Sequence, residues 1–505
     1  NSGGIKMSTE FFLTAKNTQP WYRVAYGFYA TSVGAGVIFA VPSFIVPQQY
    51  GGGWLGLFTY PFFSGFPIFL VAIMGKFIKK RFPEVLSIGS FAKWRFGNAF
   101  QTWVTLNVLL NLGIALAAEF TAIGSLFNNF LGVANWIPIM NVAVVTFAYT
   151  ALGGLYISLI TDQVQTLFIF LILCVMGIFV AVNFRTGELG PLPDYLGVTY
   201  TGEASFATLG VALISSTLFS DAVWQRVWSA KDDKALDIGA AVGGTLIILV
   251  SFLFGLGGFI AAWAGLVSDP NVAFLQLLKV GGGDIPYAVL LIVFMLAVTM
   301  NESAIDSFQI AIGDTLVSLF ESFGLKVTIF QVRLMLAALN IPFAIIGSYN
   351  FSIVNLYLVT NIMTTCVMMP LVFGLVPALD RYYTGASALF GSFFSLFWVM
   401  VYGVLNQVYQ INGGVFNGWS DISAGLYNTF YAVYDYPPFV IGLGASMVGM
   451  AIWTGGEEIY YRFIAKTERP FPSHLETPIE QIQTAVNSEV DVIPVSAVVE
   501  KEATQ

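Results

Sequence analysis

The chain has 505 residues, of which 57% are hydrophobic and only 10% are charged, with 46 Phe and 50 Gly. This composition excludes an ordinary soluble domain and indicates a protein that crosses a membrane many times. The net charge of −8 says little about partners, because charge in such a protein has to be counted loop by loop. Cys174 and Cys366 lie in apolar stretches and His474 is the single histidine, which excludes a disulfide framework, a cysteine metal centre and histidine catalysis inside the membrane.

Twelve apolar stretches have about the 20 residues needed to span a bilayer. In chain order they are 22–47, 53–79, 101–131, 136–152, 155–183, 206–223, 238–265, 286–320, 328–348, 350–377, 385–407 and 438–463. If the N-terminus is cytoplasmic, only Arg185 and Lys279 of the 21 basic residues lie outside, which is a strong positive-inside bias. We therefore expect an integral protein of the plasma membrane with both termini cytoplasmic.

The predicted organisation is an all-α polytopic membrane protein with five parts. Residues 1–21 are a cytoplasmic segment, 22–183 a first five-span repeat, 206–377 a second repeat, 385–463 two additional spans, and 464–505 a polar tail predicted to be disordered. An odd number of spans per repeat would insert the second repeat upside down. The polar loop 409–437 is expected to pack over the outer mouth.

Polar residues interrupt the stretch 286–320 near its middle, at Asn301, Glu302, Ser303 and Asp306. A charged side chain at the centre of a membrane helix costs roughly 2.5 to 3.5 kcal/mol, and such residues usually face a cavity or an ion path. This cluster therefore predicts a binding site.

Two other spans contain small and polar residues where an unbroken helix would favour Leu. The first span has Ser32, Gly34 and Gly36, and the sixth has the hydroxyl-rich sequence 215–221. Paired interruptions in corresponding positions of two halves are typical of transporters with a midplane site. The alternative is close helix packing through small residues.

Four short motifs resemble the sodium/solute symporter family. They are Phe11-Phe12-Leu13 with Pro20-Trp21, Gly153-Gly154-Leu155 before Thr161-Asp162-Gln163-Val164-Gln165, Gln225-Arg226 with Ala230-Lys231, and Ser303-Ala304-Ile305-Asp306-Ser307. The resemblance covers about residues 11–380 and implies the LeuT-like five-plus-five inverted repeat. Members usually carry one span more at the N-terminus, so we expect an N-terminal truncation.

The resemblance also implies a Na⁺ site between the first and eighth spans. Its ligands would be the backbone carbonyls of Ala30, Val33 and Met300 and the hydroxyl of Ser303. Where the family has a second hydroxyl, this chain has Ala304. Asp306 or Glu302 is expected either to supply the missing oxygen to Na⁺ or to carry a proton instead.

Each of these acids has an alternative interpretation. Asp306 could pin the eighth span, and Glu302 could face the third span. Asp162 resembles the acid on the ion's inner exit route, or it is a water-exposed acid at a helix end. Glu119 and Asn111, eight residues apart, either line the cavity or hydrogen-bond to neighbouring spans.

The implied solute site lies beside the two interruptions. The candidate residues are Ser32, Gly34, Gly36, Asn107, Asn111, Ser216, Thr217, Ser220, Glu302, Asn355 and Tyr357. Gly36 and Val37 replace the acid and amide of sugar-transporting members, which disfavours a sugar. The sequence 221–226 resembles the urea-active branch, so urea is the first candidate, with amino acids and other small solutes next.

The predicted function is a symporter that moves a small polar solute by alternating access, coupled to Na⁺ or H⁺. The alternative is a channel or a transport-derived sensor without uphill transport. No catalytic constellation, organic cofactor site or nucleic-acid motif is visible in the sequence. The expected partners are the solute and the lipid bilayer, and the oligomeric state stays open.

Overall fold

The computed structural model describes residues 16–469, apart from 84, 86, 184–188 and 281–284. The first motif, Phe11-Phe12-Leu13, and the tail from 470 onward lie outside these residues. The described part is helical and contains no β-strand beyond one isolated bridge. Its α-helices are α2 (Trp21–Ser32), α3 (Ala35–Ile38), α4 (Ala40–Ile45), α5 (Gly53–Arg81), α6 (Ile88–Phe96), α7 (Asn98–Leu131), α8 (Trp136–Asn183), α9 (Tyr200–Leu218), α10 (Asp221–Ser229), α11 (Asp233–Trp263), α12 (Tyr287–Ser322), α13 (Ile329–Ser348), α14 (Ile353–Phe373), α15 (Gly385–Asn406), α16 (Trp419–Tyr427) and α17 (Pro437–Ile459).

Within the described residues, nine helices are long and apolar enough to cross a membrane. Two further spans arise if each bent pair is one span: α2 with α3 and α4, bent by 61°, and α9 with α10, bent by 59°. The described residues thus have up to eleven spans where the sequence predicts twelve, because the predicted stretches 136–152 and 155–183 both lie on the single helix α8. The predicted boundary between 152 and 155 is wrong, because α8 is helical throughout. Two glycines lower helix propensity there without removing a backbone hydrogen bond.

Several helices that follow a loop start with a side-chain cap. Thr199, Asp232, Thr328, Ser352 and Thr384 each accept a hydrogen bond from a backbone N–H in the first turn of the next helix. The helices after the two breaks differ, since Gly34 before α3 and Ser220 before α10 provide no side-chain cap. The backbone groups at the breaks therefore need partners from elsewhere in the bundle.

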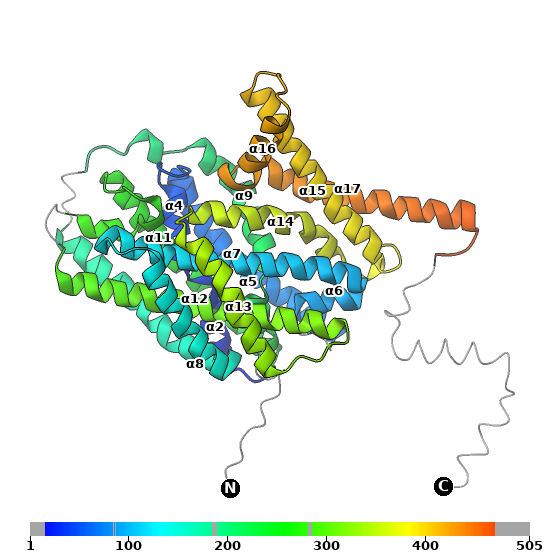
Figure 1. Ribbon diagram of the computed structural model, residues 1–505, viewed down its shortest axis with the longest axis horizontal. Helices are drawn as coiled ribbons and strands as arrows, with labels where there is room; N and C mark the ends of the chain where they lie inside the picture. The colour runs from blue at the N-terminus through cyan, green and yellow to red at the C-terminus, as the bar shows by residue number, and fades with distance from the viewer. Residues whose placement is uncertain (1–15, 84, 86, 184–188, 281–284, 470–505) are drawn as a thin grey trace, which may run out of the picture.

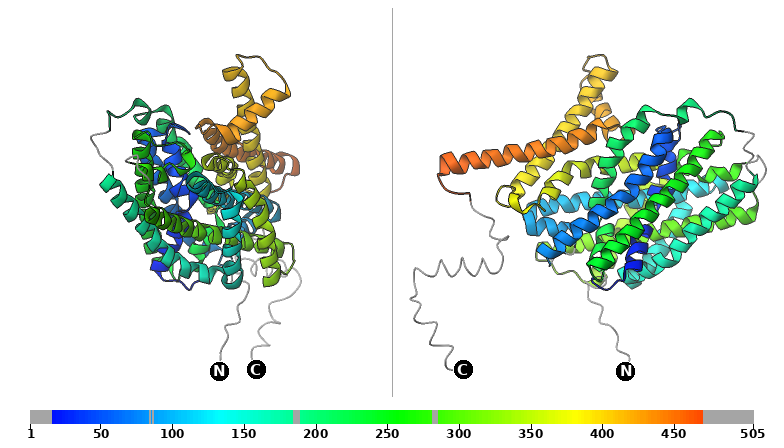
Figure 2. Two further views of the ribbon diagram at one scale, coloured as in Figure 1. Left: turned by 60° about the vertical axis from the view of Figure 1, so that its left-hand side comes forward. Right: turned by 180° about the vertical axis from the view of Figure 1, so that it is seen from behind.

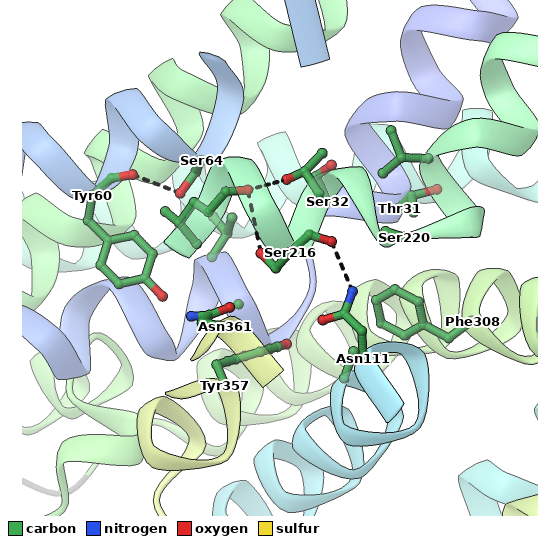
Figure 3. A pocket seen from close by; sticks show the side chains of 16 residues that line it. Thr31, Ser32, Tyr60, Ser64, Asn111, Ser216, Ser220, Phe308, Tyr357 and Asn361 are labelled. Atoms are coloured by element: carbon green, nitrogen blue, oxygen red, sulfur yellow. Dashed lines mark hydrogen bonds between the residues drawn. The ribbon is translucent and has the colours of Figure 1, made fainter. Parts of the chain in front are cut away.

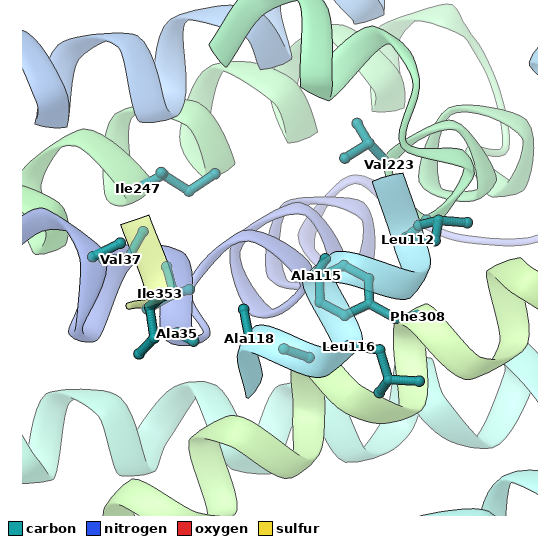
Figure 4. Packing of buried hydrophobic residues seen from close by; sticks show 14 of the residues in the cluster. Ala35, Val37, Leu112, Ala115, Leu116, Ala118, Val223, Ile247, Phe308 and Ile353 are labelled. Atoms are coloured by element: carbon teal, nitrogen blue, oxygen red, sulfur yellow. The ribbon is translucent and has the colours of Figure 1, made fainter. Parts of the chain in front are cut away.

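The broken helices lie inside the bundle. Helix α5 packs against α9 and α11, while α7 packs against α12, α13 and α14, and α8 against α12 (Figure 1). Where α3 approaches α7, small side chains including Ala35, Ala115 and Ala118 allow close contact (Figure 4).

Helices α15 and α17 pack on each other and project from the rest of the bundle (Figures 1 and 2). They expose large apolar side chains such as Phe393, Phe397, Val440 and Val448. In a bilayer these side chains would face lipid, as an apolar membrane helix requires. After α17, Arg469 forms an ion pair with Glu457, so the described chain remains bound to the bundle up to that residue.

Candidate functional site

A cavity of about 130 Å³ lies between the two breaks (Figure 3). Residues from six spans form its wall, when each bent pair is taken as one span. They are Thr31, Ser32, Gly36, Val37, Tyr60, Ser64, Asn111, Ala115, Leu213, Ser216, Thr217, Ser220, Val223, Phe308, Tyr357 and Asn361. The wall carries hydroxyl and amide groups but no charged side chain.

The structure places most of the predicted solute residues on this wall: Ser32, Gly36, Asn111, Ser216, Thr217, Ser220 and Tyr357. Four others lie elsewhere: Glu302, which is described below, and three more. Gly34 is in the break itself, against Glu119 and Ala304. The Asn107 amide donates to the Trp103 carbonyl of its own helix, and Asn355 accepts hydrogen bonds from Gln49 and Tyr50. The role of each wall residue in binding remains a prediction.

Asn111 supports the end of α9. Its Nδ2 donates to the carbonyl oxygens of Ser216, at 2.9 Å, and Phe219, at 3.2 Å (Figure 3). Carbonyls at the end of a helix have no partner within that helix. One side chain of α7 therefore stabilises the interruption of the sixth predicted span and also lines the cavity.

At the other break, the Glu119 side chain stabilises the start of α3. Its Oε1 accepts a hydrogen bond from the Ala35 N–H, at 2.7 Å, where α3 begins. A Cβ on Gly34 would lie 2.6 Å from the Ala304 methyl carbon and closer still to Glu119 Oε1. Only glycine fits this position, and the carboxyl group lies beside Ala304.

The predicted ion ligands are all buried. Ala30, Val33 and Met300 have no exposed surface. Ala30 lies in α2, Val33 directly follows it, and α2 contacts α12, which carries Met300. The Ser303 hydroxyl donates to Asp162 Oδ1 at 3.0 Å, which leaves its lone pairs available to a cation. Asp306 Oδ1 instead accepts from Ser158 at 2.9 Å and from Ser307 at 3.2 Å, within the helix packing.

A buried ion pair lies on the inner side of the cavity, the side on which the sequence predicts cytoplasmic loops. Arg226 of α10 and Asp162 of α8 are both fully buried, with the guanidinium 3.3 Å from Asp162 Oδ2. Arg226 also donates to Ser307 at 2.7 Å. Asp162 is therefore not a water-exposed acid, and this pair joins α8, α10 and α12 below the cavity.

An aromatic cluster lies at the opposite end of the broken first span, on the side where the sequence predicts outer loops. The Phe44 ring contacts Tyr60 and Tyr434, with centroids 5.5 and 5.9 Å away, and Tyr50 packs 5.7 Å from Tyr434. The Tyr434 hydroxyl accepts a hydrogen bond from Asn361 of the cavity wall at 2.9 Å. Burial raises the pKa of the Tyr434 phenol well above its usual range, so it stays neutral. Tyr434 belongs to the predicted loop 409–437, whose C-terminal end contacts the cavity wall in this way, whereas Tyr409, Val415 and Trp419 of the same loop are exposed.

Glu302 is half-buried on α12 and is not part of the cavity wall. Its neighbour Asn301 is fully buried and donates from Nδ2 to the Glu119 backbone carbonyl at 3.2 Å. The proton or ion role predicted for Glu302 stays a prediction.

Several wall residues are absent from the sequence-based set: Thr31, Tyr60, Ser64, Phe308 and Asn361. Thr31 directly precedes Ser32, so extending the first interruption by one residue would have included it. Tyr60 and Ser64 lie one turn apart on α5, a helix with no polar cluster to attract attention. Phe308 and Asn361 need the packing of α12 and α14 to be known.

We expect Asn111→Leu to raise the KM for solute about thirtyfold, because two hydrogen bonds worth about 1 kcal/mol each are lost at the end of α9. Initial uptake rates over a range of solute concentrations measure this. Asn107→Leu is the matched control on the same helix, because its amide bonds only within α7. If the two substitutions raised the KM equally, the loss of any polar side chain of α7 would be enough to weaken uptake, and the hydrogen bonds to the end of α9 would not be specifically required.

Comparisons with known proteins agree with this geometry. The family model "Sodium:solute symporter family" matches residues 11–376. The spermidine transporter DUR31 of Candida albicans is 26% identical over 427 residues, which cover 82% of this chain and 80% of that protein. The sodium/glucose cotransporter of Vibrio parahaemolyticus is 24% identical over 297 residues, or 53% of this chain and 52% of that protein.

Solved structures share the fold at low identity. A Na⁺-coupled sialic acid symporter matches with a TM-score of 0.62 and 15% identity, over 89% of this chain and 92% of that one. Mhp1, a nucleobase-cation-symport-1 family transporter, matches with a TM-score of 0.57 and 13% identity, over 94% and 98%. The fold is that of LeuT-like transporters, as the sequence motifs predict. The chain belongs to the sodium:solute symporter family.

Proposed function

We propose that this protein is a Na⁺-coupled symporter for a small, neutral, polar solute of the urea type. The observation that carries the proposal is the cavity wall, which offers hydroxyl and amide groups without a charged side chain. A neutral solute with several donors and acceptors can satisfy such groups without bringing an unpaired charge into the membrane. The volume of about 130 Å³ suits a compact molecule.

The coupling to Na⁺ rests on the family and on the buried oxygens at the first break. Binding at mid-depth with alternating exposure lets the ion gradient drive uptake, because ion and solute stabilise the same closed state. The inner ion pair and the outer aromatic cluster lie on opposite sides of the cavity, as a mechanism with two gates needs.

A linear polyamine is the second candidate, because the Candida relative is named as a spermidine transporter. Its ammonium groups would require carboxylates, and the cavity wall has none. A sugar ranks lower still, since Gly36 and Val37 offer no side chain that can hydrogen-bond.

Uptake by the purified full chain in liposomes tests the proposal. We expect labelled urea to accumulate above its external concentration under an inward Na⁺ gradient, and accumulation to stop when choline replaces Na⁺. Liposomes without protein correct for passive permeation, and excess spermidine or glucose tests the competing solutes. Equilibration at the same rate with every ion would instead indicate the channel or sensor.

A further inference from the structure

Glu119 is a buried acid without a counter-ion. It lies in the middle of α7 with 1% of its surface exposed, and it forms no ion pair among the described residues. Oε1 accepts from the Ala35 N–H, while Oε2 has no hydrogen-bond partner in the part of the chain that the structure describes. A buried carboxylate oxygen without a partner is costly, so it indicates that something else binds there.

A second unpartnered oxygen accompanies it. Asn301 uses its Nδ2 to contact the Glu119 backbone carbonyl, but its Oδ1 is buried without a partner. The break at Gly34 brings the Glu119 carboxyl group next to the Ala304 methyl group. That methyl group stands where related symporters offer a hydroxyl to Na⁺.

The other acids of this region are already engaged. Asp306 accepts from two serine hydroxyls, and Asp162 is paired with Arg226. Glu302 is only half-buried. Glu119 is thus the acid best placed to replace the missing ligand.

We propose that Glu119 supplies the oxygen lost at Ala304 to a Na⁺ ion bound at the first break. The remaining ligands are those that the family resemblance predicts: the carbonyls of Ala30, Val33 and Met300 and the hydroxyl of Ser303. Na⁺ is a hard cation that favours oxygen ligands, and a carboxylate makes the occupied site electrically neutral. This inference rests on the proposed coupling to Na⁺ and names a ligand for it.

Binding of ²²Na⁺ to the purified full chain without solute tests the ligand directly. We expect Glu119→Gln to raise the Na⁺ dissociation constant by about ten- to a hundredfold, since contacts to a charged group are lost. Adding Ala304→Ser to Glu119→Gln should recover part of the affinity by returning the hydroxyl.

Glu203→Gln is the matched control, because Glu203 is exposed in the first turn of α9. The glutamine in Glu119→Gln can still accept from Ala35, so the fold should survive, as size-exclusion chromatography can verify. Unchanged Na⁺ affinity in Glu119→Gln would overturn the inference and leave Glu119 as a cap of α3. Uptake driven by a pH gradient without Na⁺, lost in Glu119→Gln, would also overturn it and make the acid a proton carrier. Glu119-dependent Na⁺ binding without urea accumulation would support the inference while refuting the proposed solute.

Discussion

Gly34→Ala is expected to abolish uptake, because the added methyl group has no space at the first break. Its carbon would lie 2.6 Å from the Ala304 methyl carbon and closer to the Glu119 carboxyl group. Neither α3 nor α12 can move away without disturbing the packing around the break, and overpacking of this kind costs about 1–3 kcal/mol. The substitution also displaces Glu119 from the Ala35 N–H, so we expect at least a tenfold loss of initial uptake rate.

Gly444→Ala is the control for this experiment. Gly444 lies within α17, and a Cβ there meets no atom within 4 Å. Because alanine favours helix more than glycine does, uptake and thermal stability should be unchanged or slightly improved. If Gly34→Ala transported solute like the parent protein, the backbone at the break would have to accommodate the methyl group. The close contact between Gly34 and Glu119 would then not be required for transport.

Asp162→Asn is expected to reduce both uptake and stability strongly, because it leaves Arg226 buried without its carboxylate. Removing one member of a buried ion pair typically lowers the free energy of unfolding by about 3–5 kcal/mol. The double variant Asp162→Asn with Arg226→Gln removes both charges, so it should recover stability relative to Asp162→Asn. Thermal unfolding in detergent and uptake in liposomes measure the two effects separately.

The comparison pair on the surface is Arg462 with Glu458, which are four residues apart and largely exposed. Arg462→Gln should change stability by less than about 1 kcal/mol. If the double variant at Asp162 and Arg226 lost as much stability as the two single variants together, the two residues would not act as a pair.

The sequence identified the broken helices well, since the signals there are local. Glycines and hydroxyl residues at Gly34 and Ser220 reveal a backbone interruption wherever the helices come to lie, and the structure has bends at both positions. The helix end predicted between 152 and 155 failed for a local reason as well, because two glycines weaken a helix without ending it.

The directions in which side chains point, and the partners to which they hydrogen-bond, were harder to predict from the sequence. Among the polar residues of α12, Asn301 donates to the Glu119 carbonyl, and its direction, 100° around the helix from that of Glu302, depends on how α12 packs. Asn355 resembled a solute ligand in the sequence, yet Gln49 and Tyr50 bind it near the outer side. Such contacts join residues hundreds of positions apart, so spacing within one span cannot specify them.

Helix α7 holds both interruptions at once, with Asn111 at one and Glu119 at the other. The two residues are separated by about 12 Å along a continuous helix, eight residues at 1.5 Å each. When a ligand orders one break, it also restricts the motion of α7. The second break then loses less conformational entropy when its own ligand binds. The restricted motion of the rigid helix α7 would then couple the binding of ion and solute. This cooperativity should weaken if a proline or glycine introduced between Asn111 and Glu119 made α7 flexible.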